Sequence, residues 1–148
     1  MICRLKKVLD LRLYTFELDD AGFLRNMPEL ESLDLARFHF DLSLKPVDIN
    51  YINSCKKLQD IDLFMCGVED LSFFSDFKFL NKLCITGTYE DINFLSLKSD
   101  SLESIYLDSL NIKSFDGIEN VPNLKSLSVF YYAEWIYKSR GSSLQAWL

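Results

Sequence analysis

The chain of 148 residues is long enough to bury an apolar core, and its hydrophobic content of 49% excludes a disordered tail. Its 16 basic and 22 acidic residues give a net charge of −6, which argues against nucleic-acid binding because such binding depends on a basic surface. No run approaches the ~20 apolar residues of a membrane span and no secretory signal is recognisable, so we expect a cytoplasmic protein with no membrane partner.

Internal repeats run through the chain from near its start. Rows of similar sequence begin near residues 6, 30, 58, 80, 102 and 124, and each of the last three steps is 22 residues. The fourth and sixth residues of a row are aliphatic, as in Ile61 and Leu63 or in Ile105 and Leu107. Alternate side chains of a strand point to opposite faces, so each row predicts a short strand that turns these two residues inward. In chain order, the strands are expected near residues 8–12, 32–36, 60–64, 82–86, 104–108 and 126–130.

These rows resemble the leucine-rich repeats, whose signature is L-x-x-L-x-L-x-x-N/C-x-L, and "LQDIDLFMCGV" from Leu58 is the best example. Their length and later apolar positions are similar to the 22-residue class of that family. The resemblance implies one α/β repeat domain over residues 1–148, a right-handed solenoid of about six coils with a parallel concave β-sheet and an irregular or 3₁₀ convex side. The phase of "SSLQAWL" matches that of "SDSLESIYL", so residues 144–148 are expected to begin a partial seventh coil with Trp147 inward.

Two departures from the family pattern predict irregular turns. In the row from Leu80, the later apolar positions slip to Ile92 and Leu95, which predicts a local kink. At the ninth position, where the family has an inward asparagine or cysteine, only Cys66 conforms. We therefore expect the turns after the strands to be held by apolar packing instead of by an asparagine ladder. That column reads Tyr14, Phe38, Cys66, Thr88, Leu110 and Tyr132.

Catalytic and metal-binding patterns are missing from the sequence. The only histidine, His39, follows a strand without a recognisable nucleophile or orienting acid. No C-x-x-C pair suggests zinc, and Cys3 and Cys55 fall two coils apart, beyond disulfide reach. Cys66 is expected inward and Cys84 outward. We therefore expect free thiols, no enzyme activity, no metal and no cofactor.

The third, fifth and seventh residues of each row should project from the exposed face of the sheet. The fifth-position column reads Asp10, Asp34, Asp62, Cys84, Tyr106 and Ser128, and further acidic and aromatic residues flank it. Aspartate is uncommon in strands, and exposed aromatic residues often anchor protein interfaces. The expected partner-binding residues are Asp10, Asp34, Asp60, Asp62, Phe64, Met65, Cys84, Tyr106, Asp108, Phe130 and Tyr131.

A small, acidic repeat protein without catalytic groups is expected to be a non-enzymatic module that binds a protein partner with a basic surface. In composition and size it is similar to the immunity proteins with which bacteria inhibit toxic nucleases, which makes inhibition of a bacterial toxin the sharpest hypothesis. The alternatives are a scaffold, or a homo-oligomer that pairs through the open ends of the solenoid. A further alternative is an accessory piece of an enzyme or part of a longer repeat protein.

Overall fold

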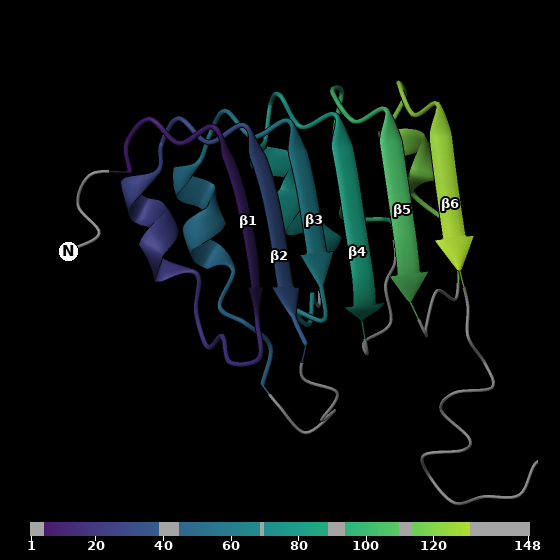
Figure 1. The fold of residues 1–148 in the computed structure, drawn as a ribbon. Helices are drawn as coiled ribbons and strands as arrows, with labels where there is room; N and C mark the ends of the chain where they lie inside the picture. Colours follow the sequence, from purple (N-terminus) through teal and green to yellow (C-terminus); the bar gives the residue numbers. More distant parts are fainter. Residues whose placement is uncertain (1–4, 39–44, 69, 89–93, 110–113, 131–148) are drawn as a thin grey trace, which may run out of the picture.

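The computed structural model describes residues 5–38, 45–68, 70–88, 94–109 and 114–130. Within them, six strands form one sheet in which every neighbouring pair is parallel and the spatial order follows the chain (Figure 1). This confirms the expected parallel sheet. The strands are β1 (Asp10–Thr15), β2 (Ser32–Arg37), β3 (Asp60–Phe64), β4 (Lys82–Thr88), β5 (Ser104–Ser109) and β6 (Ser126–Phe130).

Short 3₁₀ helices lie between the strands and stand behind one face of the sheet (Figure 1). Their apolar side chains point at the sheet, as shown by the complete burial of Leu24, Ile52 and Phe74. The third helix begins after Asp70, whose carboxylate accepts a hydrogen bond from the Ser72 backbone N–H and so caps it. In the described part of the chain, these helices are η1 (Gly22–Asn26), η2 (Asn50–Ser54), η3 (Leu71–Asp76) and η4 (Ile118–Asn120).

The core lies between the sheet and these helices. The register aligns Leu63 with Ile85, Ile85 with Leu107, and Leu107 with Val129, which confirms the expected inward column. The first three of these side chains have essentially no exposed surface. Burial of such columns across neighbouring strands is the main source of stability in a stacked repeat array.

A ladder of backbone carbonyl groups fixes where each strand begins. The carbonyl of Gln59 accepts hydrogen bonds from the N–H groups of Asn81 and Lys82, at 2.7 and 3.0 Å. The carbonyl of Asn81 does the same for Glu103 and Ser104, at 2.9 and 3.1 Å. We call this series the carbonyl ladder, and its accepting residues are Leu9, Glu31, Gln59, Asn81 and Glu103.

The first strand corrects the sequence-based register. It pairs Asp10 with Ser32 and Arg12 with Asp34, so the first row begins at Val8 and not near residue 6. Three leucines alternate in "VLDLRLY", and two registers therefore satisfy the pattern equally well. The structure selects the later one, which places the first row 22 residues before Leu30.

Three other expectations are wrong. Leu95 is 60% exposed, whereas Phe94 is fully buried, so the slip expected after β4 does not bring Leu95 inward. Tyr14 and Phe38 were expected to pack inward at the ninth position but are exposed. Cys66, the one conforming residue of that column, is buried as expected. The expectations for Cys3, His39, Ile92, Leu110, Tyr132 and residues 144–148 lie outside the described residues.

Candidate functional site

The face of the sheet opposite the 3₁₀ helices carries most of the expected partner-binding residues. Registers between neighbouring strands align Asp34 with Asp62, Asp62 with Cys84, and Cys84 with Tyr106. This row of side chains therefore crosses β2 to β5 as predicted. All four residues are partly accessible to solvent.

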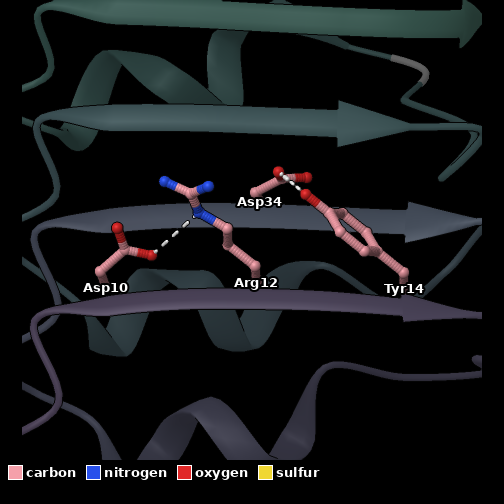
Figure 2. Close-up of polar contacts among 4 residues, drawn as sticks. All are labelled: Asp10, Arg12, Tyr14 and Asp34. Carbon is pink, nitrogen blue, oxygen red and sulfur yellow. Dashed lines mark hydrogen bonds and ion pairs between the residues drawn. The ribbon is translucent and has the colours of Figure 1, made fainter.

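Asp10 does not belong to this row, which corrects the expected column of three aspartates. The residue beside Asp34 in β1 is Arg12, and its Nε lies 3.5 Å from Asp10 Oδ1 (Figure 2). Both side chains are more than half exposed, so this ion pair adds little stability. The acidic part of the row therefore consists of Asp34 and Asp62 only, and the positive charge of Arg12 lies beside Asp34 on β1.

The Asp34 carboxylate is oriented by Tyr14 from the neighbouring strand. Figure 2 shows the Tyr14 hydroxyl pointing at Asp34, and its Oη donates a hydrogen bond of 2.5 Å to Asp34 Oδ2. This hydrogen bond to a charged acceptor is the main reason why the pKa of Tyr14 lies above its ordinary value. The hydrogen bond thus holds the ring and the carboxylate in one arrangement.

Asp62 and Cys84 form a second polar pair on the same face. Burial raises the pKa of Asp62, and the nearby charge of Asp34 raises it further, whereas a hydrogen bond from Cys84 lowers it. Burial, followed by the charge of Asp62, raises the pKa of Cys84 to about 12. Cys84 is therefore a neutral thiol that donates to a carboxylate, and not an activated nucleophile.

An exposed aromatic cluster, which sequence reasoning missed, lies at the carboxyl ends of β1 to β3. The Phe38 ring centroid lies 6.1 Å from that of Tyr14, 6.3 Å from that of Phe16 and 5.6 Å from that of Phe64. Tyr14 is 56% and Phe16 70% exposed. Only Phe64 was expected on this face. Tyr14 was missed because the first row was read two residues out of register, and Phe38 was missed because the ninth position was expected to point inward. We call Tyr14, Phe16, Phe38 and Phe64 the aromatic cluster.

A second aromatic pair lies at the other end of the sheet. The rings of Tyr106 and Phe130 are 5.2 Å apart across β5 and β6. Asp108 pairs with Phe130 in the register, and burial raises the pKa of its carboxyl group. The aromatic side chains of the face therefore form two groups, one over β1 to β3 and one over β5 and β6, and Cys84 in β4 lies between them. Tyr131 lies outside the described residues.

Met65 contributes to packing more than to the exposed face. Its backbone has a positive φ of 56°, and its N–H donates to the Thr86 carbonyl at 2.7 Å. Its Sδ atom rests on Gly87, where an added Cβ would come within 2.1 Å of the sulfur. A side chain at residue 87 would displace Met65, so the glycine is needed for this close approach.

Comparisons of the chain with protein-family models, with curated proteins and with solved structures found no match. The arrangement of side chains is then the basis for any functional argument. Among the described residues, no group of three or more His, Cys, Asp or Glu side chains could hold a metal ion. Nor does that part of the chain contain a helix with the length and apolar character needed to cross a membrane.

Charged side chains line a hollow in this face. A depression of about 310 Å³ over β1 to β4 has three carboxylates and two cations among its lining residues. Its net charge is therefore negative, and the aromatic cluster begins directly beyond it because Phe64 follows Asp62 by two residues. The charged lining residues are Arg12, Asp34, Asp60, Asp62 and Lys82.

Proposed function

We propose that the protein is a non-enzymatic module that binds a protein with a basic surface on the exposed face of its sheet. The observation that carries this proposal is the position of the Asp34 and Asp62 carboxylates, on adjacent strands, beside the aromatic cluster. Carboxylates attract a basic partner from a distance and disfavour acidic competitors. Exposed aromatic rings supply the contact area that interface hot spots require.

The fold behind this proposal is a right-handed solenoid of leucine-rich-repeat type with the binding face on its concave side. The 22-residue steps, the sequential parallel strands and the 3₁₀ return segments support it. In such an array each repeat places one set of outward side chains beside the next, so neighbouring repeats build one continuous surface.

Inhibition of a bacterial toxin is the sharpest form of the proposal. A toxin that acts on nucleic acid needs a basic surface for its substrate. An acidic, cytoplasmic protein of net charge −6 could cover that surface and keep the toxin inactive. The alternative, self-association through the ends of the sheet, is supported by the exposure of Leu9 beside the first described strand and of Leu127 in the last described strand.

The test is affinity capture from the native host with face variants and matched controls. Asp62→Asn should reduce recovery of a basic protein, and Phe38→Ala should reduce it at every salt concentration. Asp116→Asn and Phe79→Ala make the same chemical changes at exposed residues outside the sheet face, and they should have no effect. Equal recovery with all four variants, or recovery of an acidic protein, would contradict the proposal.

A further inference from the structure

The hollow in the sheet face has an ordered charge pattern. Its charged side chains come from four adjacent strands, β1 to β4. The register puts Arg12 beside Asp34, and Asp34 beside Asp62. It also puts Asp60 beside Lys82. From β1 to β4 the charges of the lining side chains are therefore positive, negative, negative and positive, which differs from a uniformly acidic surface.

Both cations of the hollow are accessible to a bound molecule. Arg12 contacts Asp10 through its Nε, and Figure 2 shows the two terminal nitrogens of Arg12 directed away from Asp10 and toward β2. The Arg12 side chain is 67% exposed. Lys82, on the opposite side of the hollow, is exposed as well. The cations can therefore form ion pairs with acidic groups of a partner.

The spacing of the strands fits an extended peptide segment laid across them. Neighbouring strands lie ~4.8 Å apart, so β1 and β4 are separated by ~14 Å. In an extended chain, alternate side chains point to the same side, and residues four positions apart are separated by ~13 Å. The first and fifth side chains of such a segment can therefore reach Arg12 and Lys82. Its third side chain then lies between Asp34 and Asp62.

We infer from this charge pattern that the hollow takes an extended segment of the partner in which one basic residue has acidic residues two positions before and two positions after it. The basic side chain binds between the carboxylates of Asp34 and Asp62, and the acidic side chains pair with Arg12 and Lys82. The two cations also repel a uniformly basic segment, which makes the hollow selective. The inference rests on the proposed function, because it names the feature of the basic partner that the sheet face recognises.

Two synthetic peptides with blocked ends test the pattern in a nuclear magnetic resonance titration of the full chain. The acidic-flank peptide is Thr-Glu-Thr-Arg-Thr-Glu-Thr, and the neutral-flank peptide has glutamine in place of both glutamates. The wild type should bind the acidic-flank peptide at least ~3-fold more tightly, because that peptide gains two exposed ion pairs. The net charge of −6 would favour the opposite order. The amide signals of Asp34 and Asp62 should shift in the titration.

Charge variants show which groups cause the preference. Arg12→Gln combined with Lys82→Gln should reverse it, because the acidic flanks then meet a hollow that contains carboxylates and no cation. Lys78→Gln combined with Lys98→Gln is the matched control. It removes the same total charge from two exposed lysines outside the strands, and it should keep the wild-type preference.

Four results would overturn the inference. These are failure of the wild type to bind the acidic-flank peptide, equal or tighter binding of the neutral-flank peptide, unchanged amide signals of Asp34 and Asp62, and loss of the preference in the control variant. The proposed function is tested separately, because capture of a basic protein that depends on Asp62 requires no acidic flanks. Asp62-dependent capture together with any of these four results would leave the proposed function standing without the charge pattern.

Discussion

Replacement of Leu107 by alanine tests the stacking of inward columns that the whole fold depends on. Leu107 is completely buried and lies in register between Ile85 and Val129. Truncation of a buried leucine costs ~2–5 kcal/mol of unfolding free energy, through lost apolar burial and the cavity that remains. Val129 is only partly buried, so the surroundings can relax on that side. We therefore expect the middle of the range, about 2.5–3.5 kcal/mol.

Urea denaturation followed by far-ultraviolet circular dichroism measures this cost. The transition midpoint should fall while the m-value stays constant, because the surface exposed on unfolding hardly changes. Leu95→Ala makes the same chemical change at a side chain that is 60% exposed, and it should cost less than ~1 kcal/mol. A loss below about 1 kcal/mol for Leu107→Ala, or an equal loss for both variants, would refute the stacking argument.

Three further predictions concern the polar and thiol groups. Burial raises the folded-state pKa of Asp62, so protonation of this carboxyl group stabilises the folded protein. This contribution to the free energy of unfolding is fully present below about pH 3.9 and is lost as the pH rises through the raised pKa. Asp62→Asn should therefore be more stable than wild type at pH 7, and a less stable variant would contradict the burial. Cys66 and Cys84 should react slowly with a thiol reagent at pH 8, because burial raises the pKa of both thiols to about 12. Cys84, the more exposed, should react before Cys66, and the reverse order would show that the repeat frame is wrong there. Tyr14→Phe removes the hydrogen bond to Asp34 and should remove from a spectrophotometric tyrosine titration one step that lies above the ordinary tyrosine pKa, whereas an unchanged titration would contradict that bond.

The strands could be predicted wherever the repeat left a single register. In β3 and β6 the aliphatic pairs are separated by polar residues, so only one alternation turns them inward, and both strands lie where they were expected. The first row alternates Leu9, Leu11 and Leu13, so the choice between two registers depends on pairing with β2, which sequence alone does not show. That local error had a functional consequence. It brought Asp10 into the acidic column, where the structure has Arg12.

Sequence reasoning missed most of the aromatic cluster for a related reason. Its members come from three repeats, and Phe16 and Phe38 occupy the position at which Cys66 turns inward in the next repeat. Large rings do not fit the space that a cysteine fills, so in the first two repeats they stay on the exposed side. One signal in the sequence could have corrected the register of the first row: the step from Val8 to Leu30 is 22 residues, the same as the later steps. Counted from Val8, Tyr14 shares the seventh position with Phe64.

The most direct test of the central claim is the salt dependence of the association rate with the captured basic partner. Asp34→Asn combined with Asp62→Asn should slow association at low salt and flatten its dependence on ionic strength, because it removes the adjacent carboxylates of the face. Asp116→Asn, which removes an exposed carboxylate outside that face, should retain the wild-type slope. Unchanged association kinetics in the double variant, or an equal effect of Asp116→Asn, would contradict binding at the sheet face.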